Sequence, residues 1–280
     1  MSQRNFQKNQ GKSKRKGDFS KRPARTYRKP KPQGSQSSVA AAESGLIRLN
    51  KYLANSGICS RREADTFIAA GSVSVNGKTI TEMGFKVKKD DTVRFDGRVI
   101  IPEKKEYILL NKPKNFITTT RDEKGRRTVM ELISKASKSR LVPVGRLDRN
   151  TTGLLLFTND GDLAKKLTHP KHQVRKIYHV ELNKNLASTD FNNIQKGLTL
   201  DDGPIKIDEV TFIENKPKKE VGIEIHSGRN RIVRRIFEHL GYKVVKLDRV
   251  VLGGLTKKDL PRGHWRRLTA QEEINLRMLK

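Results

Sequence analysis

The chain has 280 residues, of which 60 are Lys or Arg and 30 are Asp or Glu, and its formal net charge is +30 at pH 7. So large an excess costs self-repulsion in the folded state and points to a polyanionic partner, first of all nucleic acid. No apolar stretch approaches the roughly 20 residues of a membrane-spanning helix, and the N-terminus lacks the apolar segment of a secretory signal. The single cysteine, Cys59, excludes an internal disulfide and a multi-cysteine metal site. We therefore expect a cytoplasmic protein without a membrane partner, in which Cys59 is a small buried filler.

Residues 1–46 are predicted to form a disordered basic arm. They carry twelve Lys or Arg against two acidic residues, Asp18 and Glu43, and almost no large apolar side chains. Such a segment cannot bury enough surface to offset the entropy lost on ordering. It suits a salt-sensitive tether to phosphates. The alternative is a solubilising tail with no specific role.

Residues 47–104 are predicted to form a small separate module. Its first helix carries apolar side chains at helical spacing and ends at Gly57. A second helix begins at Ser60, because Ser60 and Glu63 have the spacing of a capping box. The following "SVSVNGKTI" alternates in the manner of strands around Asn76 and Gly77, which is a strong signal for a hairpin.

Two arginines of this module, Arg61 and Arg62, lie in the first turn of the second helix. Positive charge is unfavourable there because it opposes the helix dipole, so we expect an outside partner such as phosphate. The stretch "SRREAD", followed by "VNG", resembles the alpha-L RNA-binding domain of ribosome-associated and RNA-modifying proteins. This resemblance implies that Lys51, Arg61 and Arg62 contact RNA.

Residues 105–280 are predicted to form an α+β domain with a mixed, largely antiparallel sheet flanked by helices. Strand-like runs alternate irregularly with helical ones, which favours this class over a regular parallel sheet. We expect strands at 107–110, 141–145, 153–158, 176–182, 221–227 and 242–252. We expect helices at 128–136, 161–168, 188–197 and 229–241. No Gly-rich phosphate loop of the G-x-G-x-x-G or Walker kind is present.

Two apparent metal sites fail on inspection of their residues. "DRNTTG" begins like a calcium loop at Asp148, but the twelfth position is Asn159 instead of a bidentate glutamate. His169 and His172 are three residues apart without an evident third ligand, so we expect them to face solvent or RNA. The sequence predicts no metal.

A lone carboxylate, Asp148, lies in the basic stretch "VGRLDRNTTG". Arg146 and Arg149 flank it, and Gly145 and Gly153 permit a tight backbone on both sides. A carboxylate near guanidinium groups is a ready anion at neutral pH. The spacing alone fits a salt-bridged turn as well as a catalytic acid exposed between two strands.

A second cluster lies at the start of the helix predicted for 229–241. Four arginines fall within seven residues beside the helix N-terminus, where such crowding is unfavourable; they are Arg229, Arg231, Arg234 and Arg235. The crowding is explained if some of them hold RNA phosphates and one pairs with a buried acid. Tyr178 shares a predicted strand face with Val180 and Leu182 and fits either a core tyrosine or a site residue.

Taken together, these stretches resemble the pseudouridine synthases. "YILLNKP", "VGRLDRNTTGLLLFTNDGDLAKKLTHP", "KIYHVEL" and "GRNRIVRRIFEHLG" occur in the family's order, and the branch that modifies ribosomal RNA also carries an N-terminal alpha-L domain. The resemblance implies that Asp148 is the catalytic aspartate, that Tyr178 lies beside the target base, and that Arg234 pairs with the aspartate. Ile232 stands where this branch often has Gln, and Asn115 where it often has Gly.

The resemblance implies an enzyme that isomerises a uridine of ribosomal RNA, of the large subunit, to pseudouridine without a metal or organic cofactor. The carboxylate would act as nucleophile or as base, on a base flipped out of structured RNA. Arg146, Arg229 and Arg231 are our candidates for holding the RNA backbone, and we expect a monomer. The rival hypothesis is a non-catalytic RNA-binding or ribosome-assembly factor.

Overall fold

The computed structural model describes residues 45–279. Apart from residues 45 and 46, the predicted basic arm lies outside the described residues, so its state stays a prediction. Within the described range, no helix has both the length and the apolar character needed to cross a bilayer.

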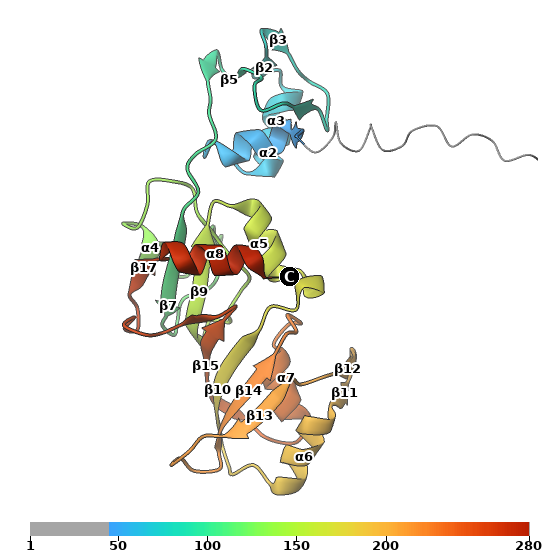
Figure 1. Cartoon of the computed structure of the whole chain (residues 1–280), viewed down its shortest axis with the longest axis vertical. Helices are drawn as coiled ribbons and strands as arrows, with labels where there is room; N and C mark the ends of the chain where they lie inside the picture. Colours follow the sequence, from blue (N-terminus) through green and yellow to red (C-terminus); the bar gives the residue numbers. More distant parts are fainter. Residues whose placement is uncertain (1–44, 280) are drawn as a thin grey trace, which may run out of the picture. The chain divides into compact units, whose positions relative to one another are not determined.

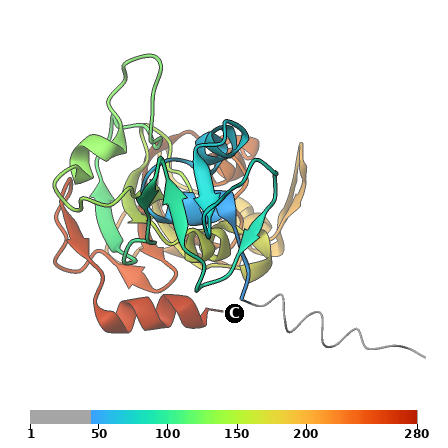
Figure 2. The same ribbon diagram turned by 90° about the horizontal axis from the view of Figure 1, so that it is seen from above.

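The N-terminal module contains two helices and six short strands (Figure 2, blue to green). Their bounds are β1 Ile47–Arg48, α2 Leu49–Asn55, α3 Arg61–Ala69, β2 Val73–Val75, β3 Lys78–Thr79, β4 Lys86–Val87, β5 Val93–Phe95 and β6 Arg98–Val99. The predicted capping box is confirmed, since Ser60 Oγ accepts from the Glu63 amide and Glu63 Oε2 accepts from the Ser60 amide. The predicted hairpin is confirmed as well, with Asn76 and Gly77 both at positive φ between β2 and β3. Cys59 is buried, as expected.

The C-terminal part of the described chain is built on a nine-stranded sheet in the order β13-β14-β10-β15-β9-β7-β17, with β8 and β16 paired to β9 and β15. All neighbours are antiparallel except β9 and β15, which run parallel, so the predicted mixed, largely antiparallel sheet is confirmed. Its strands are β7 Tyr107–Lys112, β8 Val142–Pro143, β9 Thr152–Thr158, β10 Lys176–Leu182, β13 Glu209–Phe212, β14 Glu220–Ile225, β15 Val244–Leu252, β16 Leu255–Thr256 and β17 Trp265–Arg267. A separate hairpin is formed by β11 Leu198–Leu200 and β12 Gly203–Ile205.

Helices cover both faces of this sheet because its central strands are apolar on both sides. Ile108 and Leu110 of β7 belong to one core with α7, whereas Tyr107 and Leu109 belong to a second core with α5 and α8. Figure 1 shows α5 and α8 lying over β7 and β9. The bounds are α4 Val129–Ile133, α5 Gly161–Thr168, η1 Pro170–His172, α6 Ser188–Lys196, α7 Ile232–His239 and α8 Ala270–Met278. The predicted helices therefore exist, with α4 and α7 shorter than expected.

The parallel pair β9 and β15 depends on a glycine. Gly153 lies opposite Arg249 in the register and has φ +106°. A Cβ atom on Gly153 would collide with the backbone of Arg249 and with the Asp248 carboxylate. The absence of a side chain thus lets the strand that follows the Asp148 turn lie close to the middle of β15.

We expect Gly153→Ala to lower the free energy of unfolding by about 3 kcal/mol or more, because it adds a backbone collision to the strain of positive φ. Gly125→Ala is the matched control, since Gly125 has φ +64° with open space around its Cβ position, and it should cost about 1 kcal/mol. Urea unfolding of both variants measures the difference. Equal losses would show that the close approach of the strands is not what requires Gly153.

Candidate active site

The turn that carries Asp148 is held from beneath by a buried lysine. Lys112, the last residue of β7, has no exposed surface. Its Nζ donates to the carbonyl oxygens of Asp148 at 3.1 Å, Arg149 at 3.2 Å and Thr151 at 2.8 Å, and to that of Pro113 at 3.0 Å. Burial lowers the pKa of Lys112 to about 8, against the opposing charge of Asp148. One ammonium ion thus gathers the carbonyl groups of the whole turn.

A neighbouring loop fixes the two ends of the same turn. The Thr118 hydroxyl donates to the Leu147 carbonyl at 2.8 Å and accepts from the Leu147 amide at 3.2 Å. The backbone N–H of Asn115 donates to the Arg149 carbonyl oxygen at 2.9 Å. Asn115 has φ +70°, a left-handed conformation that asparagine tolerates. The residue that departs from the family pattern therefore fits its place without a glycine.

Two arginines of α7 approach the Asp148 carboxylate. The distances to its Oδ2 are 3.6 Å from Arg231 Nη1 and 3.7 Å from Arg234 Nε. The Asp148 side chain is 35% exposed and that of Arg234 only 12%, so the acid is more open to solvent than the buried acid that the arginine crowding suggested. Among the described residues, neither Arg146 nor Arg149 forms an ion pair with Asp148, although both flank it in the sequence.

Arg234 is fixed by the sheet as well as by the acid. Its Nη1 donates to the Val244 carbonyl at 3.0 Å. Burial lowers the pKa of Arg234, the nearby Arg231 adds to this effect, and the Asp148 charge opposes it. The Asp148 charge therefore compensates part of the buried charge of Arg234, as does that of Glu238, although the separation from Asp148 is too long for a hydrogen bond.

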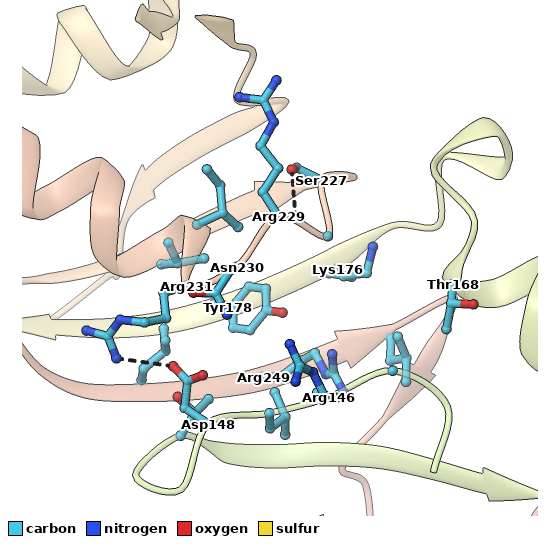
Figure 3. Close-up of a pocket in the computed structure, with 18 of the residues that line it drawn as sticks. Arg146, Asp148, Thr168, Lys176, Tyr178, Ser227, Arg229, Asn230, Arg231 and Arg249 are labelled. Carbon is cyan, nitrogen blue, oxygen red and sulfur yellow. Dashed lines mark hydrogen bonds and ion pairs between the residues drawn. The ribbon is translucent and has the colours of Figure 1, made fainter. Parts of the chain in front are cut away.

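A cavity of about 260 Å³ opens beside the carboxylate. Asp148 and Arg231 stand at one side of it, and the ring of Tyr178 forms a wall (Figure 3). Tyr178 is 8% exposed and alternates with the buried Val180 and Leu182 along β10, as predicted. The volume lies below the roughly 300–1,000 Å³ of most small-molecule pockets, so the cavity suits one flat ring more than an extended ligand.

Two cations at the far end of this cavity were not predicted as site residues. Lys176 Nζ donates to the carbonyl oxygens of Val174 at 3.0 Å and His226 at 2.9 Å. Burial, and then the charge of Arg249, lower the pKa of Lys176 to about 8. Arg249 is 3% exposed. A partial signal was present in the sequence, since Arg249 directly precedes the apolar run 250–252 and Lys176 lies two residues before Tyr178, on the same strand face.

The four arginines around the start of α7 divide into two pairs. Arg231 and Arg234 face Asp148, as described above. Arg229 and Arg235 instead reach Asp202 in the β11–β12 turn, at 3.4 Å and 2.8 Å. Arg231 itself has φ +48° at the helix N-cap, and its Nη2 also reaches Glu238 at 3.3 Å. RNA contact by Arg229 stays a prediction.

The remaining predicted RNA contacts lie in the N-terminal module. Arg61 and Arg62 are exposed in the first turn of α3, as the sequence suggested. Lys51 in α2 forms an ion pair with Asp162 at 2.7 Å. Their contact with RNA stays a prediction, and Lys51 would have to exchange its partner to make it.

A second cavity, of about 450 Å³, lies on the other side of the Asp148 turn. The loop around 117–126 lines it, with the Arg126–Asp122 ion pair at 2.6 Å. Arg146, Asp148 and Asn230 border both cavities. The turn therefore borders both an aromatic-walled cavity and a second, more polar one. Groups of three or more potential metal ligands do not occur among the described residues.

Comparison with known proteins finds two matching family models. Residues 106–239 match the RNA pseudouridylate synthase family, and residues 47–93 match the S4 domain. The chain is 39% identical over 237 residues to the ribosomal large subunit pseudouridine synthase B of Bacillus subtilis (strain 168). This alignment covers 84% of this chain and 97% of the relative. It is also 39% identical over 240 residues to the protein of the same name from Vibrio cholerae, with coverage of 83% and 74%. A crystal structure of a pseudouridylate synthase superposes with a TM-score of 0.59 at 29% identity, over 82% of this chain and 99% of the other.

We expect Lys112→Met to lower the free energy of unfolding by about 3 kcal/mol or more, because it leaves several buried carbonyl groups without a donor. The difference from the wild type should grow between pH 8 and pH 10. The folded lysine loses its proton near pH 8 and the unfolded one near 10.4. In this window the unfolded chain binds more protons, so the wild type gains stability as the pH rises.

Urea unfolding at several pH values measures both effects. Lys114→Met is the matched control, since Lys114 is exposed two residues further along the chain, and it should change little. A loss for Lys112→Met that matches the control, or a difference that does not vary with pH, would contradict the role given to this ammonium ion.

Proposed function

Since this chain belongs to the RNA pseudouridine synthase family, we propose that it converts one specific uridine of large-subunit ribosomal RNA to pseudouridine, with Asp148 as the catalytic group. The family matches confirm the resemblance seen in the sequence, including the alpha-L module, which corresponds to the S4 match. The names of the two curated relatives support the large subunit as the source of the substrate. Cytoplasmic location and a monomeric state stay predictions.

The observation that carries this proposal is the cavity in which Asp148 and Tyr178 lie together. The reaction breaks the C1′–N1 bond of uridine, turns the ring, and joins C1′ to C5. The proton on C5 leaves and N1 gains one, so the composition of the nucleotide is unchanged. A carboxylate can serve as nucleophile or as base in such a sequence, and an aromatic wall can hold the flat ring while it is loose.

The surroundings of Asp148 suit this chemistry. Arg231 and Arg234 balance the charge of the Asp148 carboxylate from one side. The hydrogen bond from Lys112 Nζ to the Asp148 carbonyl oxygen fixes the backbone of the same residue. A catalytic group must be held in place before the substrate arrives, because ordering it during the reaction would add to the barrier. The partial exposure of Asp148 leaves it accessible to a base flipped out of the RNA.

We assign the binding of RNA to three regions of the chain. Residues 105–280 form the catalytic domain, with Arg146, Arg229 and Arg231 at the rim of the cavity to hold the distorted backbone. Residues 47–104 form the alpha-L domain, and residues 1–46 a basic tether. The excess of Lys and Arg over acidic residues supports binding to RNA, since each phosphate contact releases counterions.

Asp148→Asn should abolish pseudouridine formation while RNA binding changes less than about threefold, because the substitution removes the reactive charge and leaves the basic surface intact. We would map pseudouridines in ribosomal RNA from cells that carry only the variant gene. Asp201→Asn, in the exposed β11–β12 turn, is the matched control and should retain the modification. If every modified uridine persists with Asp148→Asn, the enzyme hypothesis fails for this site, and the rival assembly-factor function is favoured.

Deletion of residues 1–45 should weaken RNA binding and flatten its dependence on salt, because phosphate contacts by the arm contribute to the slope of log K against log salt. A full-length variant with the twelve basic residues of the arm replaced by Gln separates charge from length. The single-turnover rate at saturating RNA should stay near that of the wild type. A salt slope equal to that of the full-length chain would show that the arm does not touch RNA.

A further inference from the structure

Arg249 has a hydrogen-bond donor that the protein does not use. The residue is 3% exposed in the middle of β15. Its Nε donates to the Leu154 carbonyl at 2.8 Å, but its Nη2 is buried without a hydrogen-bond partner. An unpaired buried donor costs about 1–3 kcal/mol, and more when it is charged. A cation kept in this state in a central strand indicates a ligand that completes it.

The strand register places the Arg249 side chain on the same sheet face as Tyr178, beside the same cavity. Arg249 and Tyr178 are cross-strand partners in the antiparallel pair of β15 and β10, and such partners project from the same sheet face. Both side chains line the cavity, together with Lys176 (Figure 3). A ring that packs against Tyr178 therefore presents part of its edge to Arg249.

The charges around the cavity are unbalanced at this end. Asp148 is the only acidic residue among those that line it, and Arg231 and Arg234 already approach its carboxylate. Arg249 and Lys176 thus lack a neutralising acid among the described lining residues. Burial and the charge of Arg249 lower the pKa of Lys176, and Asp208, which does not line the cavity, only partly opposes this effect.

The burial of Arg249 decides which part of an RNA can reach it and Lys176. Arg146 and Arg229 at the rim are exposed and can reach phosphates that stay in water. Arg249 is almost fully buried, so the group that meets it must have entered the cavity, as a flipped base does. The cleavage of the C1′–N1 bond leaves its electron pair on N1, and the ring shares this charge with its O2 and O4 oxygens.

On the basis of the proposed function, we propose that Arg249, with Lys176 beside it, binds a carbonyl oxygen of the flipped uracil and balances the negative charge that the ring carries while it is detached. The unused Nη2 donor is the contact to this oxygen. No co-reactant is needed, since the electron pair returns to the sugar when C1′ joins C5 and N1 takes up a proton. Preorganised donors of this kind act mainly where charge develops during the reaction.

The test is the single-turnover rate of pseudouridine formation on an RNA that carries the mapped uridine. Arg249→Met should lower this rate about 100-fold or more, as for the loss of one donor to a developing oxyanion. RNA affinity should change less than about threefold, because phosphate contacts dominate it. Arg249→Lys should recover part of the rate. Arg175→Met is the matched control, since Arg175 pairs with Glu224 outside the cavity, and it should leave the rate unchanged.

A purely structural role is distinguished by replacing the uracil oxygens. RNAs with 2-thiouridine or 4-thiouridine at the target replace one carbonyl oxygen at a time by sulfur, a weaker acceptor. If Arg249 binds that oxygen, the rate reduction caused by both changes together should be smaller than the product of the two separate reductions. Should Arg249→Met fail to fold, Arg249→Lys is combined with the thio-substituted RNAs in the same comparison.

The outcomes separate this inference from the function on which it rests. A wild-type chain that forms no pseudouridine refutes the proposed function itself. A wild type that is active, together with an Arg249→Met rate near that of the wild type or with multiplicative effects at both oxygens, refutes only the contact proposed for Arg249.

Discussion

The arrangement of the site depends on one buried ammonium ion. Lys112 ends a central strand and gathers the carbonyl oxygens of Asp148, Arg149 and Thr151 around a single Nζ. Carbonyl groups that converge in this way repel one another, so the turn needs a buried hydrogen-bond donor at its centre. The position of the Asp148 carboxylate at the border of both cavities follows from this contact.

The parallel pair in the sheet gives the site its second half. Because Gly153 lets β9 approach β15, the turn before β9 comes to lie beside Arg249, whose cross-strand partner is Tyr178. The turn before β9 and the strands β10 and β15 thus bring a carboxylate, an aromatic ring and a guanidinium group to one cavity. The wall and floor of the cavity are rigid strand positions, while its rim is formed by the turn and the start of α7.

The sequence predicted what local patterns determine. Three features could be predicted because each depends on residues close together in the chain. They are the capping box at Ser60, the hairpin at Asn76 and the apolar alternation around Tyr178. The spacing around Asp148 favoured a charged turn over a catalytic acid, and the family resemblance reversed that choice. The contacts of Lys112 could not be predicted, and for Arg249 the sequence signalled a charge beside an apolar run but not its unpaired donor, because both depend on which distant strands become neighbours.

The β11–β12 hairpin has a consequence for the carboxylate that it never touches. Asp202 in its turn holds both Arg229 and Arg235, and these two residues bracket Arg231 and Arg234 on the same short helical start. Two ion pairs thus join the hairpin to the start of α7, the segment that also carries the arginines around Asp148. Because Asp202 takes up the charges of Arg229 and Arg235, it leaves Arg231 and Arg234 to approach Asp148. A surface turn therefore takes part in the charge distribution around the cavity, although its own sequence carries no sign of that role.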